Sequence, residues 1–160
     1  MIDFLSDNSA LESIMEKVYV ESLLSLPGDV PIGAAIYNVS NDQLVLVAKS
    51  HNTRESIKDP TNHAEINVIR ESAKLLGDWR LDKCIMFTTL EPCIMCASTL
   101  VQSRIGAVVF GAYDEQYGAC GSIYNFLGDS RLNHNAPVIG GVLKEKCSEN
   151  LKHFFTNLRT

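Results

Sequence analysis

The stretch "DPTNHAEINVIRE" (residues 59–71) decides the fold, because it opens a helix and places a histidine two residues before a glutamate. Apolar residues follow at helical spacing, so the sequence predicts a helix over residues 62–77 that ends at a glycine. Asn62 is a natural N-cap for this helix, and Glu65 three residues later completes a capping-box pattern. Taken alone, the histidine and the glutamate are explained as the first turn of a helix.

A cysteine pair about 30 residues downstream changes that interpretation. "LEPCIMC" (residues 90–96) places Cys93 and Cys96 three apart at the start of a second predicted helix, where they are near neighbours. A redox pair or half of a zinc ribbon is an alternative, but a ribbon needs a second pair that the other three cysteines do not supply. With His63 the pair makes three ligands, as in catalytic zinc sites with an open fourth position. A structural zinc module would need a fourth protein ligand, and no residue is placed to provide one.

Glu65 has a catalytic role in this interpretation. We expect two helix N-termini to face one metal ion, since their positive dipole ends favour deprotonated thiolates. Glu65 lies in the same helical turn as His63, so its carboxylate can take a proton from water at the metal and pass it to a leaving group. The pattern H-x-E followed by P-C-x-x-C is the signature of zinc deaminases. The sequence thus predicts one Zn²⁺ per chain, bound by His63, Cys93 and Cys96, with Glu65 as the catalytic residue.

Predicted helices and buried strands alternate along the chain, which indicates an α/β protein with a central sheet covered on both faces. The length of 160 residues suits one domain spanning residues 1–160. The sequence predicts a β-hairpin over 31–50, buried strands over 83–90, 105–111 and 136–143, and helices over 8–28, 62–77, 91–104 and 144–159.

The net charge of −5 is unevenly distributed, since residues 1–30 hold six acidic residues and one basic residue. This balance argues against broad nonspecific binding to nucleic acid but allows a local basic patch. No apolar run is long enough to span a membrane. The first ten residues contain two aspartates and no lysine or arginine, unlike a signal peptide, so we expect a cytoplasmic protein.

Three segments of the chain resemble the bacterial tRNA-specific adenosine deaminase family in order and spacing. They are "DPTNHAEI" (59–66), "TLEPCIMCASTLVQSRIGAVVFGAYDEQYGACGS" (89–122) and "LNHNAPVIGGVLKEKCSENLKHFF" (132–155). The first is shared with guanine and cytosine deaminases, whereas residues 103–122 are more characteristic of the tRNA enzymes. The resemblance implies a three-layer α/β/α cytidine deaminase-like fold with a mixed five-stranded sheet. It also implies a homodimer with each site near the subunit boundary.

The same resemblance implies hydrolysis of adenosine to inosine at the wobble position of a tRNA anticodon, typically of an arginine tRNA. It assigns Asn52, Ala64 and Asp114 to substrate binding, with the Asn52 amide on the target base and Asp114 near the neighbouring sugar. A turn asparagine and a solvated loop acid are the plain alternatives for Asn52 and Asp114. A small-molecule deaminase acting on guanine, cytosine or a nucleoside is the alternative function, which the acidic balance slightly favours.

The expected RNA partner is an anticodon stem-loop. The closing segment 144–160 holds four basic and two acidic residues, so we expect RNA to approach it and the loop over 113–121. Only Arg159 follows Lys152 as a basic residue, which predicts fewer phosphate contacts than in a strongly basic relative.

Overall fold

The computed structural model describes residues 2–158, so Arg159 lies outside the described part. Helices and strands alternate along the chain, as the sequence predicts. In chain order they are α1 (Ile2–Leu5), α2 (Asn8–Ser22), the 3₁₀ turn η1 (Leu23–Ser25), β1 (Gly33–Ser40), β2 (Gln43–His51), α3 (Arg54–Ile57), α4 (Ala64–Leu76), β3 (Cys84–Leu90), α5 (Ile94–Gln102), β4 (Ala107–Ala112), the 3₁₀ turn η2 (Phe126–Gly128), β5 (Val138–Ile139) and α6 (Lys144–Leu158).

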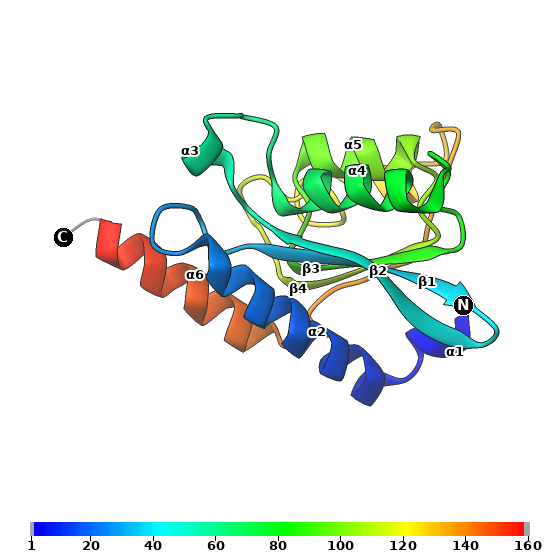
Figure 1. Ribbon diagram of the computed structural model, residues 1–160, viewed down its shortest axis with the longest axis horizontal. Helices are drawn as coiled ribbons and strands as arrows, with labels where there is room; N and C mark the ends of the chain where they lie inside the picture. Colours follow the sequence, from blue (N-terminus) through cyan, green and yellow to red (C-terminus); the bar gives the residue numbers. More distant parts are fainter. Residues whose placement is uncertain (1, 159–160) are drawn as a thin grey trace.

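The five strands form one mixed sheet in the order β2-β1-β3-β4-β5. β1 is antiparallel to β2 and β3, whereas β3, β4 and β5 run parallel to one another. Figure 1 shows α4 and α5 on one face of the sheet and α2 and α6 on the other. The predicted three-layer α/β/α architecture with a mixed five-stranded sheet is therefore confirmed.

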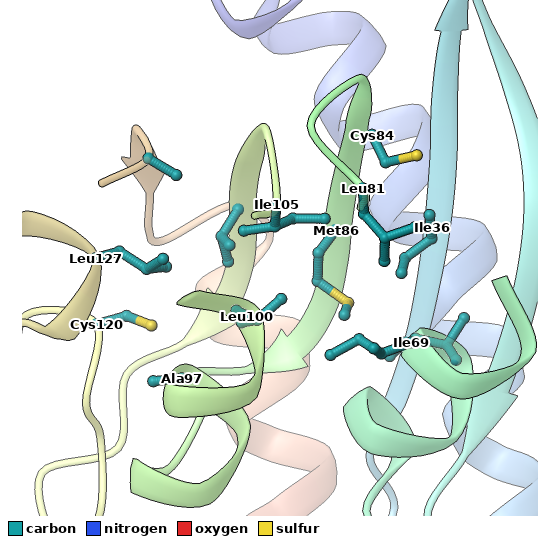
Figure 2. Packing of buried hydrophobic residues seen from close by; sticks show 14 of the residues in the cluster. Ile36, Ile69, Leu81, Cys84, Met86, Ala97, Leu100, Ile105, Cys120 and Leu127 are labelled. Carbon is teal, nitrogen blue, oxygen red and sulfur yellow. The ribbon is translucent and has the colours of Figure 1, made fainter. Parts of the chain in front are cut away.

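Both faces of the central strands are buried, which explains their nearly continuous apolar sequences. Successive side chains point to opposite faces, so Met86 of β3 packs under α4 and α5 while Phe87 packs under α2. Figure 2 shows Met86 in one cluster with Ile69 of α4 and Leu100 of α5. This cluster fixes α4 and α5 next to each other on one sheet, and their first turns carry the predicted ligands.

The first long helix, α2, begins at Asn8 as the sequence predicts but ends at Ser22, before the predicted residue 28. Asp7 is the N-cap of α2, and its carboxylate accepts a hydrogen bond from the Ala10 N–H at 3.0 Å. α2 also packs unusually close to β1, because a Cβ atom on Gly33 would lie 2.4 Å from the Val18 carbonyl oxygen. Glycine at position 33 is therefore required for this contact between helix and sheet.

The C-terminal part departs from the sequence prediction in two places. The last strand comprises only Val138–Ile139, because it pairs with β4 at two positions and then leaves the sheet. In α6, apolar residues at helical spacing predict a stripe that faces the core. Only part of it is buried: Phe154 is covered, but Phe155 is 46% and Leu158 is 65% exposed. Of the helices within residues 2–158, none is long and apolar enough to cross a membrane.

Candidate active site

The three predicted ligands lie together at the starts of α4 and α5. The ligand atoms of His63, Cys93 and Cys96 all lie within 4.8 Å of one another. His63 Nδ1 is 3.7 Å from Cys93 Sγ and 3.6 Å from Cys96 Sγ. Two sulfur atoms and one imidazole nitrogen at this spacing fit Zn²⁺, which favours nitrogen and sulfur ligands. The donor set is therefore that of a zinc site with three protein ligands.

The local backbone leaves these side chains available to a metal. His63 is the N-cap residue of α4 and Cys93 is the N-cap residue of α5, yet neither side chain caps its own helix. The prediction of Asn62 as N-cap is wrong, because its side chain donates to Thr53 Oγ1 at 2.6 Å instead. Pro92 immediately precedes the N-cap of α5.

The thiols and the imidazole already interact as a charged group. A hydrogen bond from Cys96, assisted by His63, lowers the pKa of Cys93 to about 4. The hydrogen bond to Cys93 in turn raises the pKa of His63, and the Cys93 thiolate together with burial raises the pKa of Cys96 well above its ordinary value. A divalent cation would replace the thiol protons, because cysteine binds a metal as the thiolate.

Glu65 lies beside this cluster and is 3% exposed. Burial raises the pKa of its carboxyl group to about 7. Its Oε2 atom is buried and, among the described residues, has no hydrogen-bond partner. Because Glu65 is the second residue of α4 rather than the partner of an Asn62 cap, the capping-box explanation is wrong. A carboxyl group with a pKa near neutrality can both accept and donate a proton.

Ala64 directly follows His63 in the chain, and Asn52 directly follows β2. Asn52 is buried, donates from Nδ2 to the Val30 carbonyl at 3.2 Å, and accepts from the Arg54 N–H at 3.3 Å. The next residue, Thr53, donates its N–H to the Asn62 carbonyl at 3.2 Å, which joins the Asn52 segment to the end of the loop before α4. Ala64 is the first residue of α4 and is fully buried. Their roles in substrate binding stay predictions.

Asp114 lies in the loop that follows β4. Its Oδ1 atom accepts hydrogen bonds from the N–H groups of Gln116 and Tyr117, both at 3.0 Å, and so closes the loop into a turn. Asp114 also lines a groove of about 890 Å³ between this loop and α6, where Lys152 forms part of the opposite wall. Its contact with a substrate sugar stays a prediction.

The sequence prediction missed Glu91. This residue follows β3, is 1% exposed, and accepts hydrogen bonds from the loop that contains Asp114. The available signal was its position between an apolar strand and Pro92, where a charged side chain has no obvious route to solvent.

Comparison with known proteins supports the interpretation of this cluster as a zinc site. Residues 8–112 match the model of the cytidine and deoxycytidylate deaminase zinc-binding region. The fold, the three ligands and this match define a zinc-dependent hydrolytic deaminase, with Zn²⁺ as its cofactor.

The relatives narrow this class. The chain is 46% identical over 132 residues to the tRNA-specific adenosine deaminase of Bacillus subtilis, covering 82% of this chain and 80% of that one. It is 42% identical to the tRNA-specific adenosine deaminase of Aquifex aeolicus, covering 82% and 84%. A solved tRNA:A34 deaminase, from a study of A-to-I editing at the wobble position, superposes with a TM-score of 0.78 at 34% identity, covering 86% and 98%. The chain belongs to the tRNA-specific adenosine deaminases of the cytidine and deoxycytidylate deaminase family.

Proposed function

We propose that this protein converts adenosine to inosine by hydrolysis at the wobble position of a tRNA anticodon, with an arginine tRNA as its substrate. The observation that carries the proposal is the cluster of His63, Cys93 and Cys96 beside the unpaired carboxyl oxygen of Glu65. The named activity of the relatives supports the choice of adenosine in tRNA.

We infer that the four residues divide the chemistry between them. Zinc bound to His63, Cys93 and Cys96 supplies a Lewis acid that lowers the pKa of water near it. Glu65 takes a proton from the attacking water as the new C–O bond forms at the adenine C6. It then delivers that proton to the amino group, so that the C–N bond breaks and ammonia leaves. The buried position of Glu65 excludes bulk water from this transfer.

Asn52 and Ala64 are proposed to bind the target base. The Asn52 amide uses one hydrogen atom and one lone pair within its own loop, which leaves a second donor and a second acceptor for the base edge. The Ala64 N–H belongs to the first turn of α4, where backbone donors have no partner within the helix. Asp114 is proposed to bind a ribose hydroxyl through Oδ2, because Oδ1 holds its own turn.

We infer that the anticodon loop lies along the groove between the 113–117 loop and α6. Lys144 and Lys152 line this groove, as do the exposed rings of Tyr117 and Phe155. Aromatic rings with nearby cations are suited to unstacked bases. Lys146 contributes less, because it pairs with Glu16 of α2.

A cytoplasmic homodimer is also proposed. Three large apolar side chains are exposed near the start of α5, namely Ile94 (45%), Ile123 and Tyr124 (51% each). Ile94 directly follows the ligand Cys93, so a second copy covering these residues would shield the site from water.

The test is a substrate panel with zinc-loaded protein. It includes an anticodon stem-loop with a wobble adenosine, the same stem-loop with the adenosine moved one position, and free guanine, cytosine, adenosine and cytidine. Inosine in the first RNA alone supports the proposal. Ammonia released from a free base or nucleoside, without inosine in the RNA, would favour a small-molecule deaminase instead.

A further inference from the structure

Glu91 is a buried carboxylate whose side-chain hydrogen bonds all go to one loop. It stands between Leu90 at the end of β3 and Pro92 before α5, and it is 1% exposed. Within residues 2–158 the structure gives it no ion pair. A carboxylate buried in this way needs hydrogen-bond donors to offset the loss of water.

Four donors meet this need. Oε1 accepts from the N–H groups of Cys120 at 3.1 Å and Ser122 at 2.9 Å. Oε2 accepts from the Asp114 N–H at 3.1 Å and from the Ser122 hydroxyl group. All four belong to the loop over residues 113–122, so one side chain holds both ends of that loop.

The loop also passes directly over the carboxylate and onto the start of α5. A Cβ atom on Gly118 would lie 2.5 Å from Glu91 Cδ and 2.4 Å from the Asp114 carbonyl oxygen, so a larger residue has no room there. The Ala119 N–H donates to the Pro92 carbonyl at 2.8 Å, and Gly118 forms an antiparallel bridge with Cys93. The loop is thus attached to the same peptide segment that carries a zinc ligand.

We propose that Glu91 is a positioning residue for the RNA substrate. It sets Asp114, and with it one wall of the groove beside α6, at a fixed place relative to Cys93. This inference rests on the proposed function, because it needs an RNA that contacts both the loop and the zinc site. Glu91 acts through the loop and does not touch the reacting atoms.

Replacing Glu91 with glutamine tests whether its hydrogen bonds position the loop, because the substitution leaves the packing volume of the side chain unchanged. Oε1 faces two backbone N–H groups, which cannot turn away, whereas Oε2 faces one backbone N–H and a hydroxyl group that can rotate. The single amide oxygen therefore takes the Oε1 position, and its NH₂ group meets the Asp114 N–H, donor against donor. Glu91→Gln keeps the size of the side chain and releases Asp114.

The experiment measures steady-state kinetics of zinc-loaded wild-type protein and Glu91→Gln on the wobble-adenosine stem-loop. We expect KM to rise about tenfold or more, because a hydrogen bond to a charged group is lost. The kcat value and the zinc content should stay close to those of the wild type. Combining Glu91→Gln with Asp114→Ala should raise KM no further than Asp114→Ala alone, since both act through one side chain. Asp7→Asn, the same chemical change at the N-cap of α2, should leave KM unaltered.

An unchanged KM in Glu91→Gln, or fully additive effects in the double variant, would overturn the proposal. Loss of zinc, or a fall in kcat alone, would also overturn it, because Glu91 would then act on the metal site. If Glu91→Gln does not fold, Ser122→Ala replaces it in the experiment. Loss of the Ser122 hydroxyl group must then raise KM by less than the factor expected for Glu91→Gln, and must raise it no further in a protein that already carries Asp114→Ala. If the wild-type protein fails to deaminate the stem-loop at all, the proposed function is refuted first, and this inference with it.

Discussion

Replacing Glu65 with glutamine should stabilise the zinc-free protein at alkaline pH while removing its activity. Burial raises the pKa of Glu65 from its ordinary 4.5 to about 7. In the unfolded chain the Glu65 carboxyl group keeps its ordinary pKa of 4.5. Between about pH 4.5 and about pH 7 the folded protein therefore holds a proton on Glu65 that the unfolded chain has lost. Stability contributed by this group is therefore highest in acid, falls as the pH rises through this window, and reaches its lowest level above about pH 7.

The size of the effect follows from the two pKa values. Each pKa unit corresponds to about 1.4 kcal/mol, so the difference between 4.5 and about 7 gives about 3 kcal/mol. Glutamine has the same shape and does not ionise. The difference in unfolding free energy between Glu65→Gln and wild type should thus shift by about 3 kcal/mol in favour of the variant between about pH 5 and about pH 8.5. With zinc restored, turnover should fall by about 10²–10⁴, because the proton carrier is gone.

Urea denaturation of chelator-treated protein in reducing buffer, repeated across this pH range, measures the first effect. Inosine formation after zinc is restored measures the second. A stability difference that stays flat with pH would refute the reasoning, since Glu65 would then not be the group whose ionisation opposes folding. Near-normal turnover in Glu65→Gln would leave the residue with a structural role alone.

Three other changes test other parts of the structure. Cys96→Ala should abolish zinc binding and turnover, whereas alanine at any of the three cysteines outside the cluster should keep one zinc per chain by elemental analysis. Gly33→Ala should lower the unfolding free energy by about 1–3 kcal/mol, because its Cβ would collide with the backbone of α2. The control Gly28→Ala, with nothing within 4 Å of its Cβ, should leave the unfolding free energy unchanged. Equal urea midpoints for the two variants would contradict this prediction. Lys152→Ala should weaken RNA binding and reduce the slope of log K against log salt by about 0.7–0.9. Lys74→Ala, at the far end of α4, should change neither quantity, and equal effects in salt titrations would place the RNA elsewhere.

The clustering of His63, Cys93 and Cys96 could be predicted because each motif is local and only its partner is distant. His63 and the cysteine pair open two helices that leave the same side of one sheet, with β3 between them in the chain. The helix start itself was misplaced by one residue. Asn62 has the preference of an N-cap, but a tertiary hydrogen bond to Thr53 uses its side chain, and no pattern in residues 59–71 contains that partner.

The end of α6 shows the same limit for packing. Phe155 and Leu158 continue an apolar stripe at helical spacing, and periodicity alone predicts that they are buried. Burial also requires a surface to pack against, and both side chains remain exposed in the described chain. The stripe therefore predicted correctly which face of α6 packs on the sheet, but not how many of its residues are buried. How far the sheet extends beneath the helix is a property of the whole fold.

Burial alone does not distinguish the proposed catalytic carboxyl group, since four acidic residues are buried in the described part of the chain: Glu21, Asp29, Glu65 and Glu91. Glu21 pairs with Lys49 and His51, Asp29 accepts two backbone N–H groups at the start of α3, and Glu91 accepts four donors from one loop. Glu65 differs, because one of its oxygen atoms has no partner among the described residues. A buried oxygen without a donor is costly, and its place next to the three candidate metal ligands supports the proposal that Glu65 exchanges a proton with water and substrate there. Satisfaction of hydrogen bonds, rather than burial, separates Glu65, the proposed proton carrier, from Glu91, whose two oxygen atoms are both used by the loop.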